Sequence, residues 1–234
     1  MGKAFDPAHV RREVEAILDH GGAPTWAFSS HDHRRHVTRW AAHGADQDAL
    51  ARLCCALLLW LPGAVCLYQG EELGLAQADL AYEDLVDPEG LTFWPDNPGR
   101  DGCRTPMPWE RDAPHAGFST ARRTWLPLAS AHCERAVDTQ RDDPGSVLAF
   151  YRRMIALRRA QPDLRTGATT FLDAPDPVLA FCRGALTCAF NLGHEGAPPL
   201  AMPATGVTLI ASEAETRNDT LALGPNGFVV MTGC

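Results

Sequence analysis

Residues 26–35 read WAFSSHDHRR, an apolar run that changes abruptly into imidazole, carboxylate and guanidinium groups. Trp26 to Ser29 is expected to form a buried strand, because short apolar runs of this kind fill the interior of sheets. The side chains from Ser30 onward cannot stay buried without partners. We therefore expect the polar cluster to lie where the strand emerges, at a functional site.

A second strand of the same kind follows one helix later. Asp6 as a cap and Gly21-Gly22 as a stop predict a helix before the first strand. Apolar residues at helical spacing predict another helix over about 46–61. Ala64 to Tyr68 is then a second predicted buried strand, which runs into the polar sequence QGEELG at 69–74. This alternation, with polar groups at successive strand ends, predicts an α/β fold with a parallel sheet or barrel.

The composition of the remaining sequence changes at two points. Residues 75–145 are rich in Pro, Gly, Asp and aromatic residues and are longer than ordinary loops, so we expect them to be functional. A third helix is predicted over about 146–160. After it, short β-prone runs alternate with turn residues, which predicts a separate antiparallel β domain. The two predicted domains meet near Arg165 and are residues 1–164 and 165–234.

Composition excludes several classes of function. A net charge of −8 with scattered basic residues argues against nucleic-acid binding. The longest apolar run, 53–65, is interrupted by Pro62-Gly63 and is well short of the ~20 residues of a membrane span. The N-terminal residues 1–7 lack the apolar core of a secretory signal, so a cytoplasmic location is expected. The eight cysteines form no CxxC pair, which favours buried free thiols over disulfides or zinc. No cofactor or metal site is predicted.

Several motifs occur together in one order: SSHDHRRHVTRW at 29–40, LPGAVCLYQGEELGL at 61–75, DPEGLTFWP at 87–95 with GRDGCRTPMPW at 99–109, and SVLAFYRRMIALRRAQPDL at 146–164. In order and spacing they resemble the C-terminal half of α-glucosidases of the α-amylase superfamily, glycoside hydrolase family 13. The resemblance covers about residues 5 to 190. It implies that the two strands are the seventh and eighth of a (β/α)8 TIM barrel, and that the tail is the C-terminal antiparallel β-sandwich that follows the barrel.

The resemblance also implies roles for particular residues. Retaining glycosidases of this family use a nucleophile, an acid–base and a third carboxylate that stabilises the oxocarbenium-like transition state. Asp32 matches the third carboxylate, with His31 beside it on the same sugar and Arg35 at the position of the motif's arginine. The family pattern has Asn where this chain has Ser30. The nucleophile and the acid–base belong to earlier strands and are missing from this chain.

Elementary chemistry supports a sugar site at Asp32, since a carboxylate accepts hydrogen bonds from vicinal hydroxyls while a histidine donates to a neighbouring one. A structural cap or ion pair is the alternative. For Glu71-Glu72 we expect structural hydrogen bonds at the barrel rim, because adjacent strand residues point to opposite faces.

The long segment supplies further candidate substrate-binding residues. Arg100, together with Asp101 and Arg104, is predicted to shape the aglycone side of the pocket, and an internal salt-bridge network that folds the loop is the alternative. Trp94, with Phe93 and Trp109, is expected either to stack on sugar or to form the aromatic core of the loop.

The function predicted from the sequence is therefore the C-terminal portion of an α-glucosidase-like enzyme acting on α-linked glucose oligosaccharides such as maltose. Two strands cannot close an eight-stranded barrel. The chain alone is expected to be inactive, and poorly soluble or oligomeric, unless the missing N-terminal half is its partner. The alternatives are a non-catalytic sugar-binding relic and a fragment of a trehalose- or sucrose-isomerising or glucosyl-transferring relative.

Overall fold

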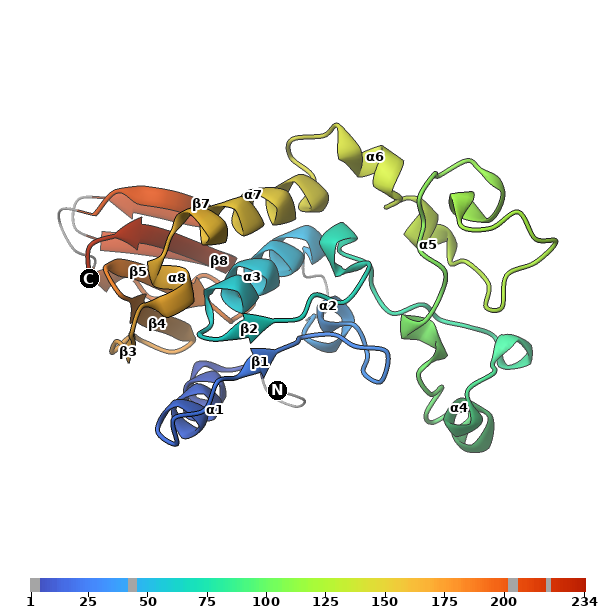
Figure 1. The fold of residues 1–234 in the computed structure, drawn as a ribbon, viewed down its shortest axis with the longest axis horizontal. Coiled ribbons are helices and arrows are strands. Elements are labelled where there is room, and N and C mark those ends of the chain that lie inside the picture. The colour runs from blue at the N-terminus through green and yellow to red at the C-terminus, as the bar shows by residue number, and fades with distance from the viewer. Residues whose placement is uncertain (1–4, 42–45, 202–205, 218–219) are drawn as a thin grey trace. The chain divides into compact units, whose positions relative to one another are not determined.

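The computed structural model describes residues 5–41, 46–201, 206–217 and 220–234. Contacts divide the chain into two compact units (Figure 1). Unit 1 consists of Met1–Trp26, Ala42–Cys66 and Arg153–Cys234, and unit 2 consists of Ala27–Ala41 and Leu67–Arg152. The predicted domain boundary near Arg165 does not coincide with this division and stays a prediction.

Two short parallel strands lie in unit 1. Strand β1 (Thr25–Trp26) pairs with β2 (Ala64–Val65), and the amide of Cys66 donates to the carbonyl of Trp26 at 2.8 Å. The parallel pairing is confirmed, but the strands are shorter than predicted and β2 is not buried, since Ala64, Cys66 and Leu67 are exposed. The reason is that each strand has one neighbour among the described residues, so its other edge and part of its surface stay uncovered.

The three long helices begin and end close to their predicted limits. They are α1 (Pro7–Leu18), α3 (Gln47–Trp60) and α7 (Val147–Ala160). Asp6 accepts from the amide of His9 at 2.8 Å, and Asp46 accepts from the amides of the first turn of α3. Such side-chain caps satisfy amides that have no partner inside the helix. These helix predictions are confirmed.

Two arginines, Arg183 (buried) and Arg158 (half-buried), bind carbonyl groups at and near the C-terminal end of α3. Arg183 is 1% exposed and donates to the carbonyls of Trp60 at 2.7 Å and Leu164 at 3.0 Å. Arg158 donates to the carbonyls of Leu59 and, at 2.7 Å, Gly63. Burial, with the charge of Arg158 nearby, lowers the pKa of Arg183 to about 10. Both cations complement the negative end of the helix dipole and fill acceptor groups that the helix leaves free.

The C-terminal part of the chain forms an antiparallel sheet of six strands. They are β3 (Thr169–Phe171), β4 (Val178–Arg183), β5 (Leu186–Asn191), β6 (Leu200–Ala201), β7 (Thr208–Arg217) and β8 (Thr220–Thr232), preceded by α8 (Asp163–Thr166). The order is β3-β4-β5-β8-β6, with β7 also paired to β8. The antiparallel prediction is confirmed, while the second layer of a sandwich stays a prediction.

Apolar side chains occupy both faces of this sheet. One face contributes a cluster that includes Val178, Ala189 and Val229. On the alternate positions the rings of Phe181 and Phe190 stack with centroids 5.9 Å apart. Every residue of β4 and β5 is buried, because both faces of these strands are covered. Strands of this kind have nearly continuous apolar sequences rather than alternating apolar and polar residues. Helix α1 contacts β4, and α3 contacts β7 and β8.

One prediction about the cysteines is wrong. Cys182 and Cys234 form a disulfide, with their Cα atoms 6.0 Å apart. Strand register brings the two cysteines together. Cys182 on β4 lies opposite Thr187 on β5, and Thr187 lies opposite Met231 on β8. Cys234 follows shortly after the end of β8 at Thr232. Four of the other cysteines are buried and outside any disulfide, as predicted; they are Cys54, Cys55, Cys103 and Cys188.

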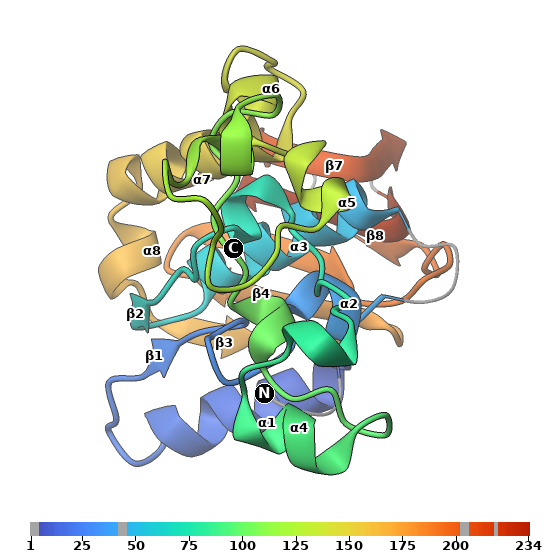
Figure 2. The same ribbon diagram turned by 90° about the vertical axis from the view of Figure 1, so that its right-hand side faces the viewer.

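Unit 2 is mostly irregular chain with short helical segments (Figure 2). Its helices are α2 (His36–Arg39), α4 (Pro88–Phe93), α5 (Ser130–Cys133) and α6 (Val137–Arg141), with 3-10 turns at Glu71–Leu73, Tyr82–Asp84, Asp101–Cys103 and Pro114–Gly117. A small apolar cluster contains Leu73, Leu75, Met107 and Leu148. The segment predicted as one long loop therefore has local structure and a core of its own.

Acid sensitivity is expected from one buried histidine of unit 2. The Nε2 atom of His132 lies 2.9 Å from the carbonyl of Ala76, and Nδ1 lies 3.2 Å from the hydroxyl of Thr105. Burial lowers the pKa of His132 below its value in the unfolded chain, about 6.5. The folded protein then binds fewer protons than the unfolded chain just below that pH, so stability falls as the pH falls.

We expect His132→Gln to flatten this pH dependence. The measurement is the free energy of unfolding in urea on either side of the histidine range, at about pH 7.5 and pH 5. The exposed His194, changed to Gln, is the control and is expected to leave the dependence unchanged. An equal acid loss of stability in wild type and His132→Gln would contradict the assignment.

No helix among the described residues has the length and apolarity to cross a membrane.

Candidate functional site

The polar cluster of the opening motif is a tight turn on the surface of unit 2. Ser30 and His33 form an isolated bridge, and the amide of Asp32 donates to the hydroxyl of Ser30 at 3.2 Å. This turn leaves the side chains of His31 and Asp32 71% and 48% exposed. The serine that replaces the family's asparagine thus supports the backbone of the turn instead of reaching outward.

The Asp32 carboxylate accepts hydrogen bonds from two guanidinium groups and lies beside an imidazole ring. Its Oδ1 atom lies 3.2 Å from Nη1 of Arg100 and 3.2 Å from Nη2 of Arg104, and its Oδ2 atom lies 3.1 Å from Nε2 of His31. Nε of Arg104 also donates to the carbonyl of His31 at 2.7 Å. Of the predicted residues, the structure brings His31 and Arg100 to Asp32. Each contact fixes the direction in which the half-exposed carboxylate can receive further hydrogen bonds.

Arg100 is itself anchored by a carboxylate that the sequence reasoning missed. Asp87 is buried and accepts from Nη2 of Arg100 at 2.7 Å, from Nε at 2.9 Å and from its amide at 2.7 Å. Asp87 also caps α4 through the amide of Glu89 at 3.3 Å. The hydrogen bonds from Arg100 hold the pKa of Asp87 well below its usual range. The signal was present, because Asp before Pro at a helix start is a common cap.

Asp101 completes this support from inside the loop. It is fully buried, and its Oδ2 atom accepts from the amides of Val86 and Asp87, each at 2.7 Å. The internal salt bridge that the sequence analysis gave as the alternative role of Arg100 is therefore present, and the partner of Arg100 is Asp87. A single network both folds the loop and presents Arg100 to Asp32.

Arg35 lies beneath the turn rather than against the carboxylate. It is 2% exposed and donates to the carbonyls of Gln69 at 3.0 Å and Cys103 at 3.2 Å. Its guanidinium also lies 5.1 Å from the centre of the Tyr68 ring. Gly70, with φ +90°, permits this approach, since a Cβ atom there would stand 2.9 Å from Nη1 of Arg35. Arg35 ties three chain segments together, and its predicted contact with sugar stays a prediction.

A second buried layer contains a histidine and a glutamate. Nδ1 of His36 lies 2.8 Å from the hydroxyl of Ser29 and 3.4 Å from Oε2 of Glu71. The neighbouring Glu72 accepts from the amide of Gly70 at 2.6 Å, and burial raises the pKa of Glu72. The structural hydrogen bond expected for this acidic pair is present at Glu72, whereas both carboxylate oxygens of Glu71 are buried without a hydrogen-bond partner among the described residues. Its conformation is a 3-10 turn and not the extended strand that was assumed.

The aromatic candidate Trp94 does not line the hollow beside the Asp32 turn. Trp94 is 40% exposed and lines a separate hollow of about 270 Å³ that also contains Arg34 and Gln77. Its ring centre lies 5.9 Å from that of Tyr82. The hollow beside the turn, about 480 Å³, is lined by His31, Arg104 and residues outside the predicted set. A contact of Trp94 with substrate stays a prediction.

The described residues hold no group of three or more His, Cys, Asp or Glu side chains arranged to bind a metal ion. The arrangement at Asp32 provides a carboxylate oriented by two guanidinium groups, with an exposed imidazole beside it. Such a set is able to exchange hydrogen bonds with hydroxyl groups, because it combines a strong acceptor with several donors. It contains one carboxylate, whereas glycoside hydrolysis uses a pair.

Comparisons with known proteins agree on one family. The family model "Alpha amylase, catalytic domain" matches residues 5–167. A Rhizobium meliloti protein described as "Probable alpha-glucosidase" is 50% identical over 83% of this chain and 36% of its own length. Maltase A1 of Drosophila melanogaster is 30% identical over 75% of this chain and 29% of its own length.

Solved structures give the same result. The alpha-glucosyl transfer enzyme XgtA is 43% identical with a TM-score of 0.91, covering 100% of this chain and 45% of that chain. A mutant of trehalulose synthase MutB is 25% identical with a TM-score of 0.84, covering 97% and 46%. The chain thus spans about a third of the curated relatives and under half of the solved structures that it matches. It belongs to the alpha-amylase family of glycoside hydrolases.

Proposed function

We propose that this chain is the C-terminal portion of an α-glucosidase-like enzyme that acts on α-linked glucose oligosaccharides such as maltose. In this proposal Asp32 accepts hydrogen bonds from hydroxyls of the glucosyl unit and stabilises positive charge that develops on it. His31 and Arg100 fix the carboxylate and donate to neighbouring oxygens. The observation that carries the proposal is the convergence of Arg100, Arg104 and His31 on Asp32.

The electrostatic part of the proposal follows from the transition state. An oxocarbenium-like species carries positive charge, so a fixed carboxylate binds it more strongly than it binds the neutral ground state. The two arginines keep Asp32 oriented without needing to move when the charge develops. The bond-breaking carboxylates come from a partner segment, the N-terminal half of the same enzyme, so the chain alone is proposed to bind sugar without hydrolysing it.

The proposal is tested by titrating the purified chain with glucose and maltose in a calorimeter. Binding without turnover is expected, and Asp32→Asn is expected to weaken it at least about tenfold, because charge-assisted hydrogen bonds are roughly twice as strong as neutral ones. Asp112→Asn changes an exposed carboxylate and is the control. Unchanged affinity in Asp32→Asn, or no binding by wild type, refutes the site. Maltose hydrolysis by the chain, lost in Asp32→Asn, refutes its inactivity.

A second candidate is a glucosyl-transferring enzyme. It is favoured by the likeness to XgtA, whose identity of 43% exceeds that of the trehalulose synthase structures. Both candidates use Asp32 in the same way and differ in whether water or another molecule accepts the glucosyl unit. Product analysis of the enzyme completed with its N-terminal half distinguishes them: glucose alone from maltose indicates hydrolysis, and longer or rearranged saccharides indicate transfer.

A further inference from the structure

The disulfide between Cys182 and Cys234 closes a loop that contains most of the antiparallel sheet. Cys182 lies in β4, and Cys234 follows β8, so β5, β6, β7 and β8 all lie within the 52-residue separation of the two cysteines (Figure 1). Strand β8 pairs with β5, β6 and β7. The cross-link lowers the conformational entropy of the unfolded chain over this whole loop, which stabilises the folded sheet.

The two cysteines of the disulfide differ in their exposure to solvent. Cys182 is 3% exposed, whereas Cys234 is an exposed residue. Thiol–disulfide exchange requires that a thiolate reach one of the two sulfur atoms. Because Cys234 is open to solvent, a small dithiol is able to attack the bond from that side while the sheet stays folded.

Hydrogen bonds hold the end of β8 beside Cys182 independently of the disulfide. The amide of Gly233 donates to the carbonyl of Ala185 at 2.9 Å, and the hydroxyl of Thr187 donates to the carbonyl of Gly233. Thr187 lies opposite Cys182 in the register of β4 and β5. These bonds do not depend on the redox state. The two thiols therefore stay close together after reduction, and re-forming the disulfide is an intramolecular step at high effective concentration.

The neighbouring Cys188 is not placed to compete for either partner. Cys188 lies on β5 directly after Thr187, and successive strand residues point to opposite faces of the sheet. Its side chain is therefore on the face away from Cys182. Cys188 is 0% exposed, and burial raises the pKa of its thiol, so it forms little of the reactive thiolate.

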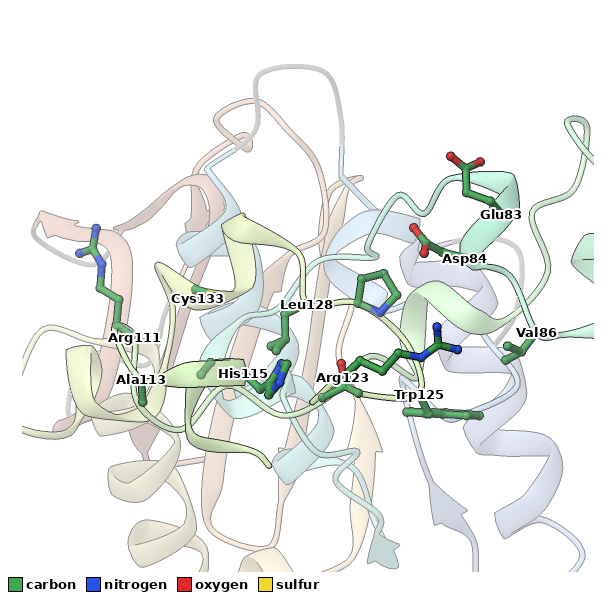
Figure 3. Close-up of a pocket in the computed structure, with 13 residues that line it drawn as sticks. Glu83, Asp84, Val86, Arg111, Ala113, His115, Arg123, Trp125, Leu128 and Cys133 are labelled. Atoms are coloured by element: carbon green, nitrogen blue, oxygen red, sulfur yellow. The ribbon is translucent and has the colours of Figure 1, made fainter. Parts of the chain in front are cut away.

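Two further cysteines are accessible but have no role in this cross-link. Cys133 lines a hollow of about 550 Å³ in unit 2, where Figure 3 shows its side chain. Among the described residues, no second cysteine lines this hollow. Cys66 is exposed and outside any disulfide. A change of redox conditions is therefore expected to act on the sheet through one bond, Cys182–Cys234.

We propose that the Cys182–Cys234 disulfide is a redox-controlled clasp of the C-terminal sheet, which dithiols open and small disulfide compounds close. The clasp lies in unit 1 and goes beyond the proposed function of Asp32, which lies in unit 2.

The opening step is an ordinary two-electron exchange. A thiolate of the dithiol attacks Sγ of Cys234, the S–S bond breaks, and the sulfur of Cys182 leaves and takes up a proton. The second thiol of the reductant then displaces Cys234, which becomes a thiol in the same way. The reductant gives up two electrons and two protons and ends as a cyclic disulfide. Closing transfers the same electrons and protons to a disulfide compound.

Opening of the clasp is expected to destabilise unit 1 and not only the end of the chain. The strand pairs nearest the clasp are those of β5 with the last residues of β8. On β4 the residue after Cys182 is Arg183, which donates to the carbonyl of Trp60 at the end of α3. Both the sheet and its contact with α3 therefore depend on the strands that the disulfide joins.

The test is urea unfolding of the purified chain, followed by circular dichroism with and without dithiothreitol. Oxidised wild type is expected to unfold at a urea concentration about 1 M higher than reduced wild type, because only the oxidised unfolded chain is cross-linked. Cys234→Ser is expected to match reduced wild type under both conditions. Oxidised glutathione, added after removal of dithiothreitol, is expected to restore the higher midpoint of wild type.

Cys188 provides a second measurement that is specific to the sheet. Its buried thiol reacts with iodoacetamide only when the sheet opens, and mass spectrometry measures the rate. Labelling of Cys188 is expected to be at least about tenfold faster in Cys234→Ser than in oxidised wild type, because local opening costs less without the cross-link.

Cys66→Ser is the matched control, because it removes an exposed thiol outside the sheet. It is expected to keep the full difference between oxidised and reduced midpoints. Equal midpoints of oxidised and reduced wild type overturn the clasp, as does a difference that survives in Cys234→Ser. Free thiols at both Cys182 and Cys234 in the oxidised chain, detected by mass spectrometry, overturn it too. A midpoint that oxidised glutathione does not restore refutes reversible closing.

Discussion

Asp87→Ala is expected to reduce glucose affinity more than tenfold although Asp87 does not touch the sugar position. Asp87 receives three hydrogen bonds from Arg100 and caps α4. Without it, Arg100 loses the bonds that aim it at Asp32, and the first turn of α4 loses its cap. The Asp87 side chain is fully buried while that of Arg100 is 37% exposed, so water screens this pair less than a pair exposed on both sides. Calorimetric titration with glucose measures the effect.

Glu89, a second carboxylate that lies near Arg100, provides the control. Oε2 of Glu89 lies 3.6 Å from Nε of Arg100, but the Glu89 side chain is 42% exposed. Exposed ion pairs contribute little because water and salt screen them. Glu89→Ala is therefore expected to leave glucose affinity within about twofold. Equal losses in the two variants would contradict the positioning role of Asp87, as would a glucose affinity of Asp87→Ala that matches wild type.

Arg183→Met is expected to destabilise unit 1 by about 3 kcal/mol, because it leaves buried carbonyls without donors. Arg183 supplies the donors for Trp60 at the end of α3 and for Leu164. Methionine fills similar space, so the loss reports the hydrogen bonds rather than a cavity. The measurement is urea unfolding followed by circular dichroism.

Arg159→Met is the control for this change. Arg159 also lies in unit 1, but its side chain is exposed. Substitutions at such surface positions are usually within about 0.5 kcal/mol of wild type. If Arg183→Met unfolds at the same urea concentration as Arg159→Met, the hydrogen bonds of Arg183 do not stabilise the fold in the way proposed.

The sequence predicts features that are local in the chain. Asp6 and Asp46 start helices α1 and α3 through bonds to amides two or three residues away, so caps and apolar spacing suffice to find them. The predictions of the two parallel strands were wrong in extent, and that of the second also in burial, because pairing depends on neighbours that the local pattern does not contain. The disulfide was missed for the same reason, since Cys182 and Cys234 meet only through the register of three strands.

In the candidate site, too, contacts between residues far apart in the sequence could not be predicted. Asp32 and His31 were recognisable because they stand together in one motif. Asp87 was not assigned, and the contact of Arg104 with Asp32 was not predicted, because these contacts join residues 13 and 72 positions apart. Arg35 stood in the correct motif, yet its side chain is buried beneath the turn. Residue type and spacing indicate chemistry, whereas the direction of a long side chain depends on the packing around it.

The wide separation of these contacts has a consequence for the order of folding. Arg100 reaches Asp32 across 68 residues, and Arg35 reaches the carbonyl of Cys103 across the same separation. Closing a long loop costs entropy before any contact compensates for it. Helices form their near-neighbour bonds in about a microsecond, well before such loops close around a specific partner. The ability to bind sugar is therefore expected to appear late in refolding, after most of the helical circular dichroism signal has returned.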